Sequence, residues 1–324
     1  MTDSCAVVMV VKGEPRERLQ RALDALAAQS GVEPFTVYVA APVSEHPTLR
    51  TLAAHGTVRE IVPVANPRGS RCAGLNAAVR AADADVVARV DARSRVHGDH
   101  LARSIARLRD DPRVGVAGGV QWPSARTDAV AEHATVRALR NRWLLGNAGY
   151  RRPGAAGPVD TVYLGAFRRA ELLELGGYDE RLDANEDFEL CSRYLAAGRT
   201  VWLEEDLLVD YEPRVGTAAL FAQYQAFGAA KVTYWRTTGS RPNRRQLLAL
   251  ALAGGGALAV LASLRRPRRT AVLVIGGIAA VALVDHLADP HEPDLRVRTR
   301  AWAASVATTT GWSWGVVQGL LTGR

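Results

Sequence analysis

Two acidic positions in this chain have the surroundings that phosphate chemistry requires. Asp91 follows the apolar run at residues 86–90, a pattern typical of a buried strand. Residues 185–189, Asn-Glu-Asp-Phe-Glu, then place three carboxylates at an expected helix start. One carboxylate can hold a divalent cation against phosphate oxygens, while another takes the proton of an attacking alcohol. The pattern indicates metal-assisted group transfer to a hydroxyl.

Each of these acids also has a purely structural interpretation. A carboxylate such as Asp91 can cap a turn or a helix. Asn and acidic residues favour the first turn of a helix, where Glu186 and Asp187 are expected, because they complement the helix dipole. From the residues alone, both interpretations stay open.

The elements that must position these acids alternate along the chain. The alternation predicts an α/β domain with a largely parallel sheet. Ligands of such sheets bind at the carboxyl ends of the strands, where Asp91 is expected. We expect two edge strands at residues 201–203 and 207–211. The other expected strands cover residues 6–11, 35–40, 58–64, 85–90, 114–120 and 161–164, and the expected helices residues 14–29, 48–54, 72–82, 101–108, 135–143, 169–175 and 187–197.

Composition narrows the possible partners. The chain has 324 residues, 48% of them hydrophobic, and a formal net charge of +8, which suits nucleic acid, anionic lipid or phosphate-bearing substrates. We expect no nucleic acid partner, because no helix-turn-helix, zinc finger or aromatic-interleaved basic ribbon is present. A nicotinamide-dependent enzyme is disfavoured because the first strand is not followed by Gly-x-Gly-x-x-Gly. Three widely spaced cysteines indicate reduced thiols in a cytoplasmic domain.

The character of the chain changes near residue 240. Residues 247–264 and 270–284 are apolar and are separated by the basic segment 265–269, which predicts C-terminal hydrophobic membrane helices. We therefore expect a catalytic domain at residues 1–240 and a membrane-associated helical region at residues 241–324. Two basic clusters flank these segments, Arg241, Arg244 and Arg245 before the first and Arg296, Arg298 and Arg300 after the second, and a hairpin that enters and leaves on one face would place both against anionic lipid. The expected location is the plasma membrane, with the catalytic domain cytoplasmic.

Three further segments carry a family resemblance. They are residues 66–76 (Asn-Pro-Arg-Gly-Ser-Arg-Cys-Ala-Gly-Leu-Asn), residues 159–169 (Val-Asp-Thr-Val-Tyr-Leu-Gly-Ala-Phe-Arg-Arg) and residues 223–231 (Gln-Tyr-Gln-Ala-Phe-Gly-Ala-Ala-Lys). Together with the two acid motifs, their order resembles inverting glycosyltransferases of family 2, and within it the ExoA-like membrane enzymes of the succinoglycan type. Without the resemblance, residues 66–76 would be a turn and helix start, and residues 223–231 an amphipathic interface helix.

The resemblance implies a fold, a reaction and roles. The fold would be GT-A, a Rossmann-like nucleotide-diphospho-sugar transferase with a mixed sheet flanked by helices. Asp187 would be the catalytic base, with Glu186 beside it in the catalytic pair, and Asp91 would hold Mg²⁺ or Mn²⁺. The implied donor-binding residues are Glu14, Arg71, Asn76, Asp91, Arg93, Gln223 and Lys231, and the acceptor and sugar pocket would contain Tyr163, Leu164 and Gly165.

The implied partners are a nucleotide-diphospho-sugar, which we expect to be a UDP-sugar, and a hydroxyl of a lipid-linked or polysaccharide acceptor in cell-envelope or exopolysaccharide synthesis. Two positions depart from the family pattern. Arg93 replaces a usual metal ligand, although it could contact diphosphate as a bidentate donor. Ala40-Ala41 replaces an acid that contacts the nucleotide base. These departures keep an alternative open, a non-catalytic membrane scaffold that partners an active transferase.

Overall fold

The computed structural model describes residues 3–141, 149–182, 184–263, 267–291 and 293–322. The chain forms two compact units. The first unit comprises residues 1–123 and 148–212, and the second comprises residues 124–147 and 213–324. A cut at the expected boundary, residue 240, would therefore pass through the second unit.

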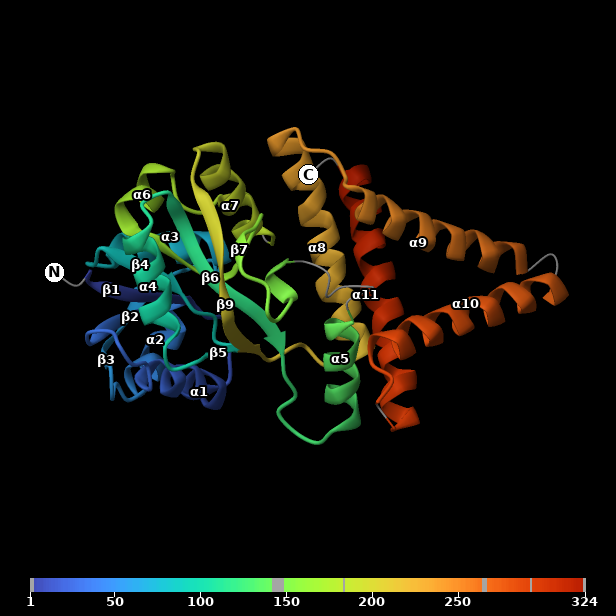
Figure 1. The fold of residues 1–324 in the computed structure, drawn as a ribbon, viewed down its shortest axis with the longest axis horizontal. Coiled ribbons are helices and arrows are strands. Elements are labelled where there is room, and N and C mark those ends of the chain that lie inside the picture. Colours follow the sequence, from blue (N-terminus) through green and yellow to red (C-terminus); the bar gives the residue numbers. More distant parts are fainter. Residues whose placement is uncertain (1–2, 142–148, 183, 264–266, 292, 323–324) are drawn as a thin grey trace. The chain divides into compact units, whose positions relative to one another are not determined.

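The first unit is built on one mixed β-sheet (Figure 1). In the described residues the strand order is β3-β2-β1-β4-β8-β6-β9-β5, with β7 paired to β9. Strands β3, β2, β1 and β4 are parallel, β8 is antiparallel to β4 and β6, β6 and β9 are parallel, and β5 is antiparallel to β9. The expected mixed α/β sheet is confirmed. The strands are β1 Cys5–Val10, β2 Phe35–Ala41, β3 Val58–Ala65, β4 Val86–Arg89, β5 Ser94–Val96, β6 Val114–Pro123, β7 Gly157–Pro158, β8 Tyr163–Arg168 and β9 Thr200–Tyr211.

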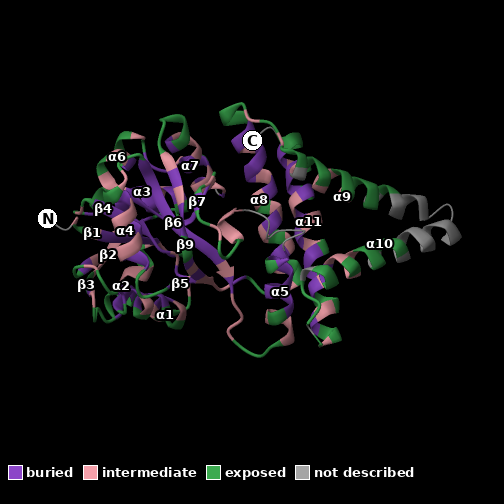
Figure 2. Ribbon diagram, viewed as in Figure 1, coloured by how far each residue is buried: buried purple, intermediate pink, exposed green. Residues whose placement is uncertain are grey.

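The helices of the first unit are α1 Arg16–Ala27, α2 His46–Arg50, α3 Arg71–Ala81, α4 His100–Asp110, α6 Arg169–Glu174 and α7 Glu186–Ala196, with short 3-10 turns η1 Val43–Glu45 and η2 Gly149–Arg151. Because successive side chains of a strand point to opposite faces, β1 contributes to two cores. Val7 and Met9 join a cluster with α1 and α4, whereas Ala6 and Val8 join a cluster with α3 and α7. Figure 2 shows the central strands buried between these helices. Both faces of the sheet are thus covered, which leaves the strand ends available for a site.

The expectation of two edge strands after α7 is wrong. Residues 200–211 form one strand, β9, and it lies inside the sheet between β6 and β5. Its pairing with β6 shifts register, and Asp206 has a φ of 52°. Glu204, Glu205 and Asp206 mark this irregularity as a run of acids, which made one bulged strand look like two.

The second unit is helical and consists of α5 Val130–Arg140, α8 Thr217–Thr238, α9 Arg244–Ser263, α10 Pro267–Ala288 and α11 Leu295–Thr322. Helices α8 and α11 pack with their backbones in close approach. A Cβ atom on Gly315 would collide with the carbonyl of Gln225, and one on Gly228 would collide with the carbonyl of Trp312. Small residues permit this approach, as in the small-xxx-small pattern of tightly packed helices. A chain ending at residue 240 would retain α8 without α11.

A buried ion network joins three helices of this unit. The Arg137 side chain on α5 is 6% exposed, and its Nε lies 2.7 Å from Asp285 Oδ1 on α10. Arg137 also bonds Asp289, and Arg298 on α11 lies 3.5 Å from Asp285. The acidic partners compensate the burial of the guanidinium. The network ties the end of α10 to α5 and α11.

The two apolar segments expected to insert in a membrane are helical, as α9 and α10. These helices extend beyond α11, and most of their described residues are exposed (Figures 1 and 2). Yet no helix within the described residues is both long enough and apolar enough to cross a membrane. The expected membrane-spanning helices are therefore not supported, and residues 265 and 266 of the basic segment lie outside the described residues.

Candidate active site

The first acid of the site lies at the carboxyl end of a central parallel strand. Val90 extends β4 by donating its N–H to Val8 O at 3.1 Å, and Asp91 follows it. Asp91 O then accepts the N–H of Ser94 at 2.9 Å, which closes a turn after the strand. The Asp91 side chain is 28% exposed, so its carboxylate lies at the surface of the sheet edge. This is the position where ligands of parallel sheets bind.

Arg89 joins this acid to the second acidic motif. Arg89 Nε donates to Asp91 Oδ1 at 2.8 Å, and Nη2 donates to Asp91 Oδ2 at 3.1 Å. The same Nη2 lies 2.9 Å from Glu186 Oε1, to which Arg71 Nη1 also donates at 3.2 Å. The structure thus brings together Asp91, Arg71 and Glu186, three of the predicted site residues. We call Asp91, Arg89, Glu186 and Arg71 the charge network.

The second motif begins a helix without a side-chain cap. Asn185 has a φ of 62°, a left-handed conformation that Asn tolerates better than most residues. The turn places Glu186 and Asp187 in the first turn of α7, where the helix dipole favours negative charge. Glu186 is 2% exposed. Burial without partners would be costly for this carboxylate, so its two arginine contacts explain how it remains in place.

The surroundings shift the pKa values of Asp91 and Glu186 in one direction and the pKa of Asp187 in the other. Burial raises the pKa of Glu186 and of Asp91, but the guanidinium groups of Arg89 and Arg71 together outweigh it, and the pKa of each is lowered. Burial and then the negative charge of Glu186 raise the pKa of Asp187 above its ordinary value. A carboxylate with a raised pKa is a stronger base. The arrangement separates two ionised, paired acids from one that is suited to accept a proton.

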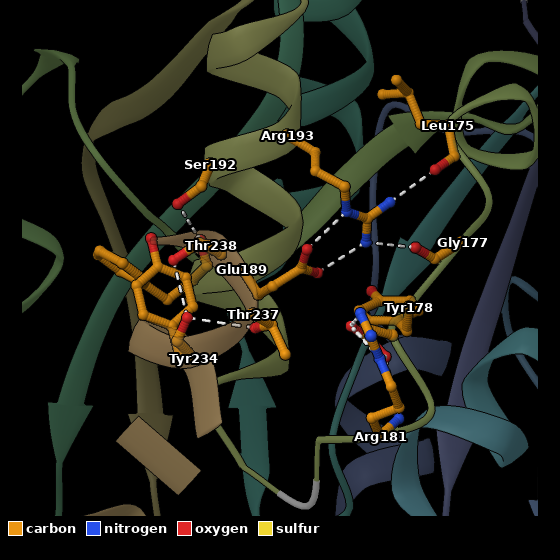
Figure 3. A network of polar contacts seen from close by, with 12 residues as sticks. Leu175, Gly177, Tyr178, Arg181, Glu189, Ser192, Arg193, Tyr234, Thr237 and Thr238 are labelled. Carbon is orange, nitrogen blue, oxygen red and sulfur yellow. Dashed lines mark hydrogen bonds and ion pairs between the residues drawn. The ribbon is translucent and has the colours of Figure 1, made fainter. Parts of the chain in front are cut away.

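A second arginine fixes α7 to the turn that precedes it. Arg193 Nε bonds Glu189 Oε1 at 2.7 Å, while Nη1 and Nη2 donate to the carbonyls of Leu175 and Gly177, each at 2.6 Å (Figure 3). Gly177 has a φ of 69°, a conformation that favours glycine. The turn at residues 176–177 is thereby held against the helix that carries Asp187.

Asn76 forms hydrogen bonds to the loop that follows this turn, at residues 178–180. Its Nδ2 donates to Tyr178 O at 2.8 Å and to Glu180 Oε1 at 3.0 Å, and its Oδ1 accepts the N–H of Tyr178 at 2.7 Å. The side chain is 6% exposed. Its described bonds are to the loop, so the structure does not place Asn76 in the charge network, and its role in donor binding stays a prediction.

Arg93 is paired with Glu14, another predicted donor-binding residue. Arg93 Nε lies 3.5 Å from Glu14 Oε1, and Glu14 Oε2 accepts a bond from Arg18 Nη1 at 2.6 Å. The carbonyl of Arg93 accepts the N–H of Glu212 at 2.8 Å. The structure therefore brings Glu14 and Arg93 together near the ends of β1 and β4. Their contact with a donor stays a prediction.

Tyr163, Leu164 and Gly165 form an irregular start to β8. The pairing of β8 with β6 shifts register between Ala117 and Gly119, and Leu164 has a φ of 52°. Tyr163 hydroxyl lies 2.7 Å from Ser94 Oγ. Burial, followed by the charge of nearby Asp91, raises the pKa of Tyr163. Tyr163 thus lies near Asp91, and the place of this segment in an acceptor pocket stays a prediction.

The remaining predicted donor ligands, Gln223 and Lys231, lie on α8 in the second unit. Lys231 is 8% exposed, and its Nζ lies 4.2 Å from the centre of the Tyr234 ring. Their contact with diphosphate stays a prediction.

The metal-binding potential of the site rests on one carboxylate. In the described part of the chain, no group of three or more His, Cys, Asp or Glu side chains converges on a metal position. Asp91 is available from one side, and Arg93 contributes no metal ligand. Mg²⁺ is often held by one or two carboxylates together with substrate phosphates. The donor set at Asp91 fits a cation shared with a diphosphate, rather than an ion held by the protein alone.

Sequence reasoning missed Arg89 and Ser94. Arg89 lies within the apolar run that predicts β4. In the structure it is 5% exposed, and it bonds both Asp91 and Glu186. A signal was present, because a charged residue inside a buried strand requires a partner of opposite charge. Ser94 carried no such signal, since its partner Tyr163 is distant in sequence.

Comparisons with known proteins bear on the family and the fold of this chain. The family described as glycosyltransferase-like family 2 matches residues 5–241. The succinoglycan biosynthesis protein ExoA of Rhizobium meliloti (strain 1021) is 31% identical over 192 residues, which cover 58% of this chain and 57% of ExoA. The aligned part thus spans little more than half of that relative.

Among solved structures, the mannosyltransferase PcManGT from Pyrobaculum calidifontis, in complex with GDP-Man and Mn²⁺, matches with a TM-score of 0.63 at 19% identity. The match covers 95% of this chain and 87% of PcManGT. At this identity the likeness shows the fold, a mixed α/β sheet of GT-A type flanked by helices. The family match includes both Asp91 and Asp187. The chain therefore belongs to family 2 of the glycosyltransferases.

Proposed function

We propose that the first unit transfers a sugar, with inversion, from a nucleotide-diphospho-sugar to an acceptor hydroxyl in cell-envelope or exopolysaccharide synthesis. The observation that carries this proposal is the charge network, which joins Asp91 at a strand end to Glu186 beside Asp187. This link supports a donor diphosphate at Asp91 and proton transfer at Asp187 as parts of one site. The similarity to ExoA, named for succinoglycan biosynthesis, supports the polysaccharide context.

In this mechanism Asp187 acts on the acceptor. Its carboxylate takes the proton of the hydroxyl while the hydroxyl oxygen forms a bond to the anomeric carbon of the sugar. The bond from that carbon to the diphosphate oxygen breaks, and the nucleoside diphosphate leaves with the electron pair. Attack opposite the leaving group inverts the anomeric configuration. Glu186 keeps its position through Arg89 and Arg71, and its charge makes Asp187 more basic.

Asp91 would hold Mg²⁺ or Mn²⁺ together with the donor diphosphate. When bound, the cation supplies positive charge that offsets the charge on the leaving group. Mn²⁺ in the PcManGT complex supports a divalent ion. Glu14, Arg71 and Arg93 would line the donor side, with Arg71 available because its side chain is 48% exposed.

The donor is proposed to be a UDP-sugar. PcManGT is in complex with GDP-Man, so a guanine nucleotide is the comparison to make. Residues Ala40 and Ala41 at the end of β2 are fully buried and carry no acid for a nucleotide base. A screen of UDP- and GDP-sugars by thermal shift, with and without Mn²⁺, tests this proposal, because a ligand that binds the folded state raises the melting temperature. A rise with a GDP-sugar and none with any UDP-sugar would refute the UDP proposal.

The acceptor is proposed to be lipid-linked or a growing glycan, with the protein at the plasma membrane and its first unit on the cytoplasmic side. Exposed leucines on α9 support this location, since Leu247, Leu248 and Leu252 are 53%, 58% and 61% exposed. An apolar surface beside basic residues suits an anionic bilayer surface. Fractionation of the full-length protein tests the location. Recovery of all the protein in the soluble fraction at low salt would count against it.

A non-catalytic scaffold remains the second candidate. It is favoured by Arg93, which is paired to Glu14 at a position where relatives carry a metal ligand. Transfer and hydrolysis assays on the full chain separate the candidates. Binding of a nucleotide-sugar without any turnover, in the presence of acceptor lipid extract, would favour the scaffold.

A further inference from the structure

Arg89 is a buried guanidinium between two acids of the site. It is the last residue of β4, and its side chain is 6% exposed. Two of its nitrogens bond the two oxygens of Asp91 at 2.8 and 3.1 Å, and one of them also lies 2.9 Å from Glu186 Oε1. A planar fork of this kind fixes the directions of its partners as well as their distance.

The strand does not need an arginine at this position for its core. Val86, Val87 and Ala88 of β4 are buried apolar residues, and an apolar residue at position 89 would continue that pattern. Replacement of a buried ion pair by apolar residues is often neutral or stabilising. The stability of β4 therefore does not explain why a guanidinium occupies position 89. Its two partners, Asp91 and Glu186, belong to different elements of the site, which suggests a role in joining those elements.

The partners connect the sheet edge to the base. Asp91 follows β4, and Glu186 opens α7 directly before Asp187. Arg71 on α3 donates to Glu186 at 3.2 Å, and within the described residues it forms no hydrogen bond or ion pair with Asp91. The direct link between the sheet-edge acid and the first turn of α7 runs through Arg89.

We propose that Arg89 is a positioning residue that holds the first turn of α7, and with it Asp187, in register with Asp91. This inference rests on the proposed function, because it assigns the donor to Asp91 and the proton transfer to Asp187. Arg89 itself touches neither substrate. It fixes the separation of the two acids, so its loss should slow transfer more than it weakens donor binding.

The test uses Arg89→Lys and Arg89→Met in the full-length protein. Lysine keeps the charge but offers no planar fork, and methionine keeps the length without charge. Arg137→Lys is the matched control, because Arg137 is equally buried and also bridges two acids, but in the second unit. For each variant, the melting temperature, kcat, KM for the donor, and hydrogen exchange of the peptide at residues 184–192 are measured.

We expect kcat of Arg89→Lys to fall about 10- to 100-fold per folded molecule, the usual effect of losing such a supporting contact, while KM changes less than about three-fold. Exchange at residues 184–192 should become faster. Arg137→Lys should lower the melting temperature without either effect. If Arg89→Met does not fold, Arg89→Lys decides the question alone.

Unchanged kcat per folded molecule in Arg89→Lys, or an equal fall in Arg137→Lys, would overturn the proposal. A wild-type protein that transfers no sugar would refute the proposed function instead. In that case the exchange measurement still decides whether Arg89 holds the start of α7, since it requires no turnover.

Discussion

Replacement of Asp187 by Asn separates the chemistry of the base from its place in the fold. Asp187 Oδ1 accepts the N–H of Phe188 at 2.8 Å, and the amide oxygen of Asn can accept the same bond. Asn also suits the first turn of a helix. The change therefore removes a proton acceptor while the local geometry is kept.

The structure predicts opposite effects on activity and stability. A general base contributes about 10²- to 10⁴-fold, so kcat should fall by that factor. Burial and the charge of Glu186 raise the pKa of Asp187, so the folded state binds its proton more tightly than the unfolded chain does. The associated stability is present below the ordinary pKa of Asp and is lost as pH rises through the folded-state value. At neutral pH the ionised group is destabilising, and Asp187→Asn should melt no lower than wild type.

Asp179→Asn is the matched control. A hydrogen bond from Arg181 lowers the pKa of Asp179, so its ionised form stabilises the fold at neutral pH, and that stability is lost as pH falls through the lowered value. This variant should melt lower and keep its kcat. The assays are steady-state transfer and thermal melts at pH 7. Retention of more than about a tenth of wild-type kcat by Asp187→Asn would show that another group is the base.

Three further predictions concern the cation, pH and helix packing. Asp91→Ala should abolish Mn²⁺-dependent binding of nucleoside diphosphate, and unchanged affinity in calorimetry would exclude Asp91 as the ligand. Burial lowers the pKa of His100 to about 4, so the neutral ring is compatible with the folded state above pH 6.5. As pH falls toward 4, the free energy of unfolding should decrease by about 3 kcal/mol. His100→Phe should reduce this pH dependence of the free energy of unfolding, measured in urea. Gly315→Leu should lower the melting temperature strongly because a Cβ there meets the α8 backbone, whereas Gly255→Leu on α9, with open space around it, should not; equal effects would contradict the close packing.

Much of the first unit follows from local pattern. Continuous β-branched runs predicted β1, β2, β3 and β4, and the alternation with helices predicted their parallel arrangement, because both signals act within a few residues. The bulged strand β9 and the left-handed Leu164 could not be predicted in this way. Their conformations depend on partners in β6 that are distant in sequence.

The division into units was also beyond the sequence pattern. Hydropathy marks residue 240 as the place where composition changes, but α8 lies before it and packs against α11. Helix α5, inserted between β6 and β8, also belongs to the second unit. The backbones of α8 and α11 approach closely at Gly228, beside Trp312, and at Gly315, beside Gln225, and small residues give little signal until the two helices are seen together.

The charges at the site indicate that binding of a donor diphosphate requires additional positive charge. Asp91, Arg89, Glu186 and Arg71 alternate in sign along their contacts, so their formal charges cancel. Asp187 adds a further acid beside them. A diphosphate entering this neutral network would bring negative charge that the network does not offset. Either a cation shared with Asp91 or a direct contact from another basic group must compensate it.

Outside the charge network, Arg93 is the basic residue nearest in sequence to Asp91, and its contact with Glu14 reduces the positive charge that it can offer to a phosphate. Glu14 is shared with Arg18, however, so a phosphate could replace Glu14 as the partner of Arg93 without leaving that acid unpaired. The two routes differ in one measurable respect. Binding through a cation disappears when Mn²⁺ is removed, whereas binding through Arg93 persists in chelator and weakens with added salt. This comparison shows whether Arg93 replaces the metal or accompanies it.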